Sequence, residues 1–116
     1  MRVLVCGGRH FDKQEWLKQV LDDLHRKHGF TLLINGGANG ADSLARVWAE
    51  RAKVPTAVFH ADWKRYGKMA GPIRNKSMLI MGKPGLVVAF PGGRGTDHMI
   101  GLAKEAGVTV VGVLAP

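Results

Sequence analysis

The sequence predicts an α/β fold, in which helices cover both faces of a five-stranded parallel sheet. Short apolar runs without alternation, as in residues 3–6 and 86–90, are typical of strands buried on both sides. These runs alternate with segments whose apolar residues recur at helical spacing, and the connections are short. Alternating strands and helices favour parallel pairing. The expected strand order is 3-2-1-4-5, a three-layer, Rossmann-like sandwich.

Two strand–helix units and a third strand are predicted in the first half of the chain. Asp12 and Glu15 have the spacing of a capping box and predict a helix start near Lys13. Apolar residues at helical spacing follow, and Gly29 is the expected end of this helix. Pro55 precedes the third strand. The expected elements are a strand at 2–6, a helix at 13–28, a strand at 31–35, a helix at 41–52 and a strand at 56–60.

The second half begins with residues 61–71, which show no clear periodicity. Pro72 then favours a helix start, because proline fits the first turn of a helix. Thr96 or Asp97 is the expected N-terminal cap of the last helix, and Gly107 is its expected end. The expected elements are a helix at 72–81, a strand at 86–90, a helix at 98–106 and a strand at 108–113.

Composition restricts the class of protein. With 46% hydrophobic residues and 16 glycines, residues 1–116 are expected to form one globular, loop-rich domain. Lys and Arg outnumber Asp and Glu by 17 to 9, and the resulting net charge of +8 favours anionic partners. No apolar run approaches the ~20 residues of a membrane span, so no membrane partner is expected. The single cysteine, Cys6, excludes an internal disulfide, and a cytoplasmic location is expected.

Glycine-rich loops follow three of the predicted strands and contain eight of the 16 glycines. In the expected strand order these loops flank one pocket at the carboxyl edge of the sheet. Free N–H groups in such loops, and at the start of the following helix, bind anions such as phosphate. The expected binding residues are Gly7, Gly8, Arg9, Gly36, Gly37, Ala38, Asn39, Gly40, Arg74, Pro91, Gly92, Gly93, Arg94, Gly95 and Thr96.

These loops do not form a standard cofactor fingerprint. The G-x-G-x-x-G spacing and the Walker A sequence are absent, and Asn35 stands where a ribose-binding acid would end the second strand. NAD binding and P-loop hydrolysis are therefore disfavoured, and no cofactor is expected. His10, His60 and His98 also lie near the expected pocket, but their spacing matches no zinc pattern, so no metal is expected.

The tryptophans divide into two groups. Trp16 and Trp48 lie on apolar helix faces and are expected in the core. Cys6 is also expected to be a core residue and not a nucleophile. Trp63 and Tyr66 lie in a basic segment. They either stack on a base or anchor this segment to the core.

The motifs resemble those of a known group. Residues 91–96 (PGGRGT) are similar to the PGGxGT signature of the SLOG superfamily. Residues 36–42 (GGANGAD), 61–63 (ADW), 71–75 (GPIRN) and 89–93 (AFPGG) resemble its YspA-like, YpsA-related branch. The resemblance implies a Rossmann-like domain that binds a nucleotide or nucleotide derivative, with the PGGxGT turn holding phosphate.

The resemblance also bears on catalysis. In the superfamily's phosphoribohydrolases, once called lysine decarboxylases, the motif continues as PGGxGTxxE and an upstream arginine assists cleavage. Met99 stands at the glutamate position here, and Arg74 matches the arginine. Asp97 and Asp42 are the alternative carboxylates, although each has a competing role as a helix cap. Arg74, Asp97 and Asp42 are therefore the candidate catalytic residues, and glutamate at position 99 is the change expected to create activity.

Three functions follow from these observations. The favoured one is a sensor or ligand-binding module for a nucleotide or nucleotide derivative, without strong catalysis. The second is a hydrolase that cleaves the N-glycosidic or a phosphate bond of a nucleotide. The third is nucleic-acid binding, suggested by the charge and by the superfamily's DNA-processing protein A. The sequence leaves open whether the chain forms a homo-oligomer.

Overall fold

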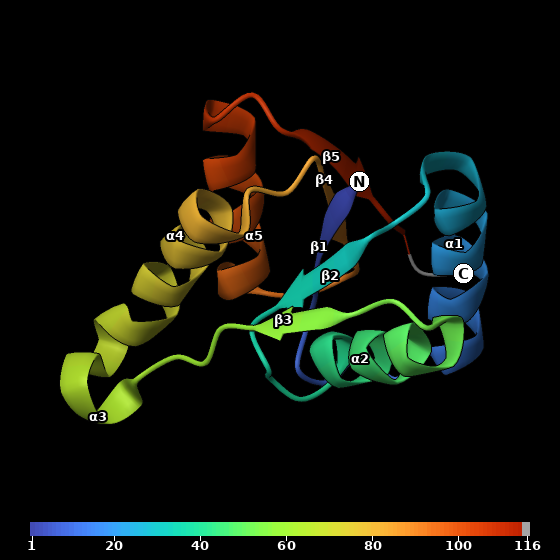
Figure 1. The fold of residues 1–116 in the computed structure, drawn as a ribbon. Coiled ribbons are helices and arrows are strands. Elements are labelled where there is room, and N and C mark those ends of the chain that lie inside the picture. Colours follow the sequence, from blue (N-terminus) through green and yellow to red (C-terminus); the bar gives the residue numbers. More distant parts are fainter. Residues whose placement is uncertain (115–116) are drawn as a thin grey trace.

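The sheet has the predicted topology. The computed structural model describes residues 1–114. Its five strands lie in the order β3-β2-β1-β4-β5, and all neighbouring strands are parallel (Figure 1). The strands are β1 (Arg2–Cys6), β2 (Leu32–Asn35), β3 (Thr56–Val58), β4 (Leu86–Ala89) and β5 (Thr109–Gly112).

Helices cover both faces of this sheet, which confirms the predicted Rossmann-like α/β arrangement. One face carries α1 (Gln14–His28) and α2 (Ala41–Ala52), and the other carries α4 (Ala70–Gly82) and α5 (Arg94–Glu105) (Figure 1). The short helix α3 (Trp63–Tyr66) and the 3₁₀ helix η1 (Gly67–Met69) precede α4. Within residues 1–114, no helix is both long enough and apolar enough to cross a bilayer.

Alternation along the strands divides the core between the two faces. In β1, Val3 and Val5 pack with the residues of α1 and α2, whereas Leu4 and Cys6 pack with those of α4 and α5. The strand β4 repeats this pattern. Because both faces of these central strands are covered, their sequences are apolar without a break, as the sequence analysis assumed.

The central strands β1 and β4 end together at the carboxyl edge. Their register pairs Cys6 with Ala89. The Phe90 N–H then donates to the Cys6 carbonyl at 2.9 Å, and the Gly8 N–H donates to the Pro91 carbonyl at 2.9 Å. The loops that follow β1 and β4 therefore leave the sheet side by side. This position is the topological switch point of the fold.

Two helix starts differ from the prediction. Helix α5 begins at Arg94, four residues early, with Gly93 rather than Thr96 or Asp97 as its N-cap. The low helix propensity of Gly95 concealed this start. Helix α1 begins at Gln14, and Lys13 is an N-cap without a side-chain hydrogen bond, so Asp12 forms no capping box. Other element ends differ from the prediction by one or two residues, as β3 does.

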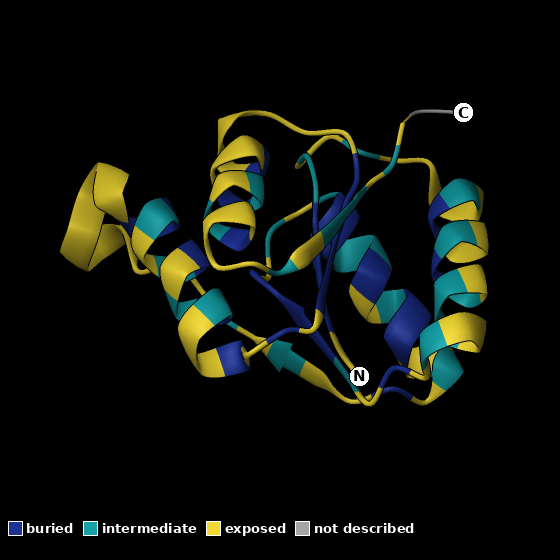
Figure 2. Cartoon of the chain, turned by 90° about the horizontal axis from the view of Figure 1, so that it is seen from above, coloured by how far each residue is buried: buried dark blue, intermediate teal, exposed yellow. Residues whose placement is uncertain are grey.

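Residues 61–71 are more regular than expected. They contain α3 and η1, and α4 begins at Ala70 instead of Pro72. Asp62 caps α3, since its carboxylate accepts a hydrogen bond from the Arg65 N–H at 3.1 Å. All residues from 62 to 69 are exposed (Figure 2). Without a buried face, the segment has no apolar stripe from which a helix could be predicted.

The tryptophans are only partly where they were expected. Trp48 is buried and its indole N–H donates to Asp22 at 2.8 Å. Trp16 is only half-buried, and its indole N–H donates to the Leu114 carbonyl at 3.1 Å, so its assignment to the core was wrong. Trp63 and Tyr66 are exposed and do not anchor their segment to the core.

Candidate functional site

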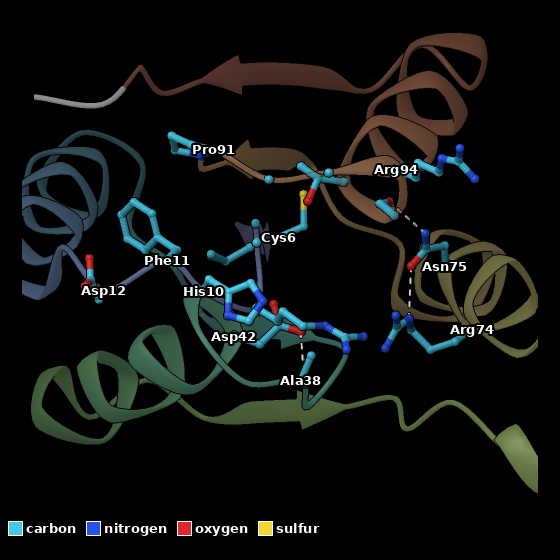
Figure 3. Close-up of a pocket in the computed structure, with 18 of the residues that line it drawn as sticks. Cys6, His10, Phe11, Asp12, Ala38, Asp42, Arg74, Asn75, Pro91 and Arg94 are labelled. Carbon is cyan, nitrogen blue, oxygen red and sulfur yellow. Dashed lines mark hydrogen bonds between the residues drawn. The ribbon is translucent and has the colours of Figure 1, made fainter.

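A cleft of about 670 Å³ lies at the switch point, between the ends of β1 and β4 (Figure 3). It brings together most of the predicted binding residues, which are Gly7, Gly8, Arg9, Ala38, Arg74, Pro91, Gly92, Gly93, Arg94, Gly95 and Thr96. The candidate catalytic residue Asp42 also lines it. The remaining predicted residues, which are Gly36, Gly37, Asn39, Gly40 and Asp97, do not line this cleft.

Glycine is required where the loops meet. A Cβ added to Gly7 would lie 2.6 Å from the Cβ of Ala41, the first residue of α2. A Cβ on Gly92 would overlap the Thr96 side chain and lie 2.7 Å from the Gly8 nitrogen. Gly7 therefore allows the start of α2 to approach the end of β1, and Gly92 allows the loop after β4 to pack against the loop after β1.

The turn after β4 brings the N-terminus of α5 to the cleft. No side chain caps this helix, and its first internal hydrogen bond runs from the Asp97 N–H to the Gly93 carbonyl at 3.0 Å. The N–H groups of Arg94, Gly95 and Thr96 precede that bond, so they have no partner within the helix. They add to the positive end of the helix dipole. A Cβ on Gly93 or Gly95 would meet no atom within 4 Å, so the space around this turn is open.

Cations outnumber carboxylates in the cleft. Its lining includes four basic and two acidic side chains: Arg9, Lys13, Arg74 and Arg94 against Asp12 and Asp42. Arg9 and Arg94 are exposed and lie on the two loops that flank the end of the sheet. An anion in the cleft would therefore meet exposed guanidinium groups as well as backbone N–H groups.

Arg74 is held in place by hydrogen bonds. Its Nη1 donates to the Gly36 carbonyl at 2.9 Å, and its Nε donates to the Asn75 side-chain oxygen at 3.0 Å. Burial lowers the pKa of Arg74 from its usual value, although the Asp42 carboxylate opposes this effect. Asn75 is buried and donates to the Gly95 carbonyl at 3.1 Å. Together these two residues of α4 connect the loop after β2 to the first turn of α5.

Asp42 holds the loop after β2 rather than capping its own helix. Asp42 is only 7% exposed, and its carboxylate accepts hydrogen bonds from the N–H groups of Gly36 at 3.1 Å and Ala38 at 3.2 Å. The N-cap of α2 is Gly40. Burial raises the pKa of Asp42 from 3.8 to about 6, while the two N–H donors and the Arg74 charge act in the opposite direction.

Cys6 does not have the properties of a nucleophile. Burial, reinforced by the nearby Asp42 carboxylate, raises the pKa of the thiol from 9.0 to about 12. The thiol is therefore protonated at neutral pH, and thiolate is the reactive form. This agrees with the assignment of Cys6 to the core.

Asp97 and Met99 lie elsewhere than the sequence suggested. Asp97 is exposed in the first turn of α5, outside the cleft lining, and it caps no helix. Met99 is fully buried in the apolar cluster that contains Met78 and Ala103. A glutamate at position 99 would place a carboxylate in that cluster. The expectation that this change creates activity is corrected: it is expected to destabilise the fold.

The three histidines are separated. His10 lines the cleft, whereas His98 lies with its Nδ1 3.1 Å from the Asn75 amide nitrogen. His60 is exposed, and its ring lies beside Gly37. Among residues 1–114, no group of three or more His, Cys, Asp and Glu side chains is arranged to hold a metal ion.

Some lining residues were missed by the sequence analysis. They are Val5, Cys6, Phe11, Asp12, Lys13, Asn75 and Met78. Phe11, Asp12 and Lys13 belong to the loop that continues after Gly7 and Gly8. The Phe11 ring packs against Phe90 with centroids 5.2 Å apart. Asn75 lies in the GPIRN motif, next to Arg74, and this position could have indicated its role.

The fold and the cleft define the class of this protein as a Rossmann-like domain with glycine loops at the switch point. Residues 1–66 match the YspA, cpYpsA-related SLOG family. The chain is also similar to the Gene 61 protein of Mycobacterium phage D29, with 37% identity over 118 residues covering 95% of this chain and 94% of that protein. The chain therefore belongs to the YspA, cpYpsA-related SLOG family. Membership indicates a function related to nucleotide derivatives.

Proposed function

We propose that the cleft binds a nucleotide or nucleotide derivative, and that the chain acts as a ligand-binding module. The observation that carries this proposal is the uncapped N-terminus of α5, which opens into the cleft between two glycine loops. A phosphate group there would accept hydrogen bonds from free N–H groups and meet the positive end of the helix dipole. Family membership supports the same class of ligand.

The dimensions and polarity of the cleft suit such a ligand. A volume of about 670 Å³ lies within the range of small-molecule sites, roughly 300–1,000 Å³. Arg94 lies at one end and the Phe11 ring at the other (Figure 3). In the proposed orientation the phosphate lies at the α5 end and the base extends towards Phe11, where an aromatic ring offers a stacking surface.

The carboxylates argue against strong catalysis. Asp97 is outside the cleft and the side chain of Met99 is in the core. Asp42 lines the cleft, but its carboxylate already accepts two backbone hydrogen bonds. These arrangements favour binding over hydrolysis.

A nucleotide hydrolase that uses Asp42 is the second candidate. It is favoured by one observation, which is the pKa of about 6 that burial gives this cleft carboxyl. The assay is release of free base or phosphate from nucleoside 5′-monophosphates. Robust turnover that is lost in Asp42→Asn would replace the binding-module proposal with this one.

The binding proposal is tested first by thermal denaturation with nucleoside monophosphates and triphosphates, cyclic nucleotides, NAD and ADP-ribose. A ligand that binds only the native state raises the melting temperature by mass action. The best ligand is then titrated by calorimetry against Arg94→Ala and against Lys104→Ala, a matched loss of charge at the other end of α5.

Arg94→Ala is expected to weaken binding by roughly 10-fold or more, which is typical of a lost charge-assisted hydrogen bond. Lys104→Ala is expected to bind like the unmodified chain, because Lys104 does not line the cleft. The proposal fails if none of these compounds raises the melting temperature, or if both variants bind with unchanged affinity.

A further inference from the structure

The segment from residue 62 to residue 73, here called the arm, projects from the body of the molecule (Figures 1 and 2). It presents large apolar side chains to solvent. Trp63 is 56% exposed, Tyr66 39%, Met69 58% and Ile73 37%. Single exposed apolar residues are common on protein surfaces, but several on one short projection indicate an interaction site.

Basic residues are interleaved with these aromatics. Lys64, Arg65 and Lys68 are all exposed, and none of them takes part in an ion pair with the described residues. The one acidic residue of the arm is Asp62, and its carboxylate already accepts the Arg65 N–H. The arm therefore carries net positive charge beside its apolar rings, and its partner must be anionic and able to stack.

The rings are positioned before any partner binds. The Trp63 ring lies over α4, with its Cη2 atom 3.5 Å from the place where a Cβ on Gly71 would be. The Arg65 guanidinium lies over the Tyr66 ring at 5.2 Å from its centroid. Contacts of this kind restrict the rings while more than a third of each residue stays exposed. Less conformational entropy is then lost when a partner stacks on them.

We propose that the arm binds single-stranded nucleic acid, with bases stacked on Trp63 and Tyr66 and phosphates paired with the three basic side chains. Aromatic rings interleaved with cations are the combination that holds single strands without reading their sequence. A duplex keeps its bases stacked inside and offers only its phosphates. A second copy of the chain is disfavoured, because two identical basic arms repel each other. This site is separate from the nucleotide cleft and does not depend on the function proposed for it.

The test measures fluorescence anisotropy of an end-labelled 12-nucleotide oligo(dT) titrated with the intact chain. Binding is expected at 50 mM salt and is expected to weaken as salt rises. Three phosphate contacts predict a slope of about −2 for the logarithm of the association constant against the logarithm of salt concentration. A labelled duplex of the same length is expected to bind more weakly.

Two variants test the arm itself. Trp63→Ala is expected to weaken oligonucleotide binding at least about fivefold, because one base loses its stacking partner. Met81→Ala is its control, since Met81 is 68% exposed at the opposite end of α4. The double change Lys64→Glu and Lys68→Glu is expected to abolish binding at 50 mM salt. The control for it is Lys27→Glu with Lys104→Glu, on α1 and α5. This pair changes the net charge by the same amount and is expected to retain most of the binding.

Several results would overturn the proposal. They are no binding of oligo(dT) at 50 mM salt, tighter binding of the duplex, or unchanged affinity in both arm variants. Loss of binding in Arg94→Ala but not in the arm variants would place the strand in the cleft. Sedimentation velocity adds a further check: if Trp63→Ala converts a dimer to a monomer without changing oligonucleotide affinity, the arm is a self-association surface. Melting temperatures confirm that each variant is folded.

Discussion

Burial and hydrogen bonding act in opposite directions on the pKa of the Asp42 carboxyl group. Two N–H donors favour its charged form, yet it is 7% exposed and desolvation prevails, so its pKa rises from 3.8 to about 6. A rise of this size corresponds to about 3 kcal/mol of free energy against the charged form. The folded chain therefore binds a proton here more tightly than the unfolded chain does.

The sign of the resulting pH dependence follows from linkage. Stability contributed by a group whose pKa is raised on folding is fully present below the unfolded pKa and is lost as pH rises through the folded pKa. The unfolding free energy of the wild type, measured relative to Asp42→Asn, is expected to fall by about 2 kcal/mol between pH 4 and pH 7. Urea denaturation of both proteins across this interval measures it. A difference that stays flat or rises with pH would contradict this assignment.

At the scale of elements, the turn between β4 and α5 contains glycines with different tasks. Gly92 packs against Thr96 and Gly8, where a side chain would overlap neighbouring atoms. Gly93, the N-cap of α5, has open space around it, because a Cβ there would meet no atom within 4 Å. In the sequence, the glycines of this motif cannot be told apart. The structure separates those needed for packing from those that leave room for a ligand.

This difference gives a matched pair of substitutions. Gly92→Ala is expected to lower the unfolding free energy by about 1–3 kcal/mol, because the new methyl group forces the loops apart. Gly93→Ala is expected to lower stability by less than Gly92→Ala does, because its methyl group meets no neighbouring atom. Melting temperatures of the two variants measure the contrast. Equal effects of the two changes would show that the packing around Gly92 does not constrain this turn.

Across the whole molecule, burial decreases from the centre of the sheet outwards. The central strands β1 and β4 have neighbours on both sides and are almost entirely buried. By contrast, β3 and β5 contain no buried residue, and residues 62–69 of the arm are exposed. Local opening requires the least free energy where few buried contacts are lost. Native-state hydrogen exchange is therefore expected to be slowest in β1 and β4 and fastest in α3. Comparable protection of α3 and β1 would exclude this ordering.

Features with a local signal were the ones that sequence analysis could predict. Unbroken apolar runs at 3–6 and 86–89 predicted the buried strands, and the glycines after them predicted the edge at which the cleft opens. The hydrogen bond that the Gly36 N–H donates to Asp42 had no such signal, because an aspartate at this position is equally suited to cap a helix. The burial of Met99 depends on the early start of α5, which turns this residue towards the sheet.

The position of β1 has a consequence for how the chain is made. Of the five strands, β1 leaves the ribosome first and becomes the middle of the sheet, and one of its partners, β2, follows within thirty residues of its end. Its other partner, β4, begins only at Leu86. Until then the nascent chain carries an open strand edge of unpaired N–H and C=O groups, flanked by apolar side chains. During this interval the chain is exposed to mispairing with its neighbours on a polysome.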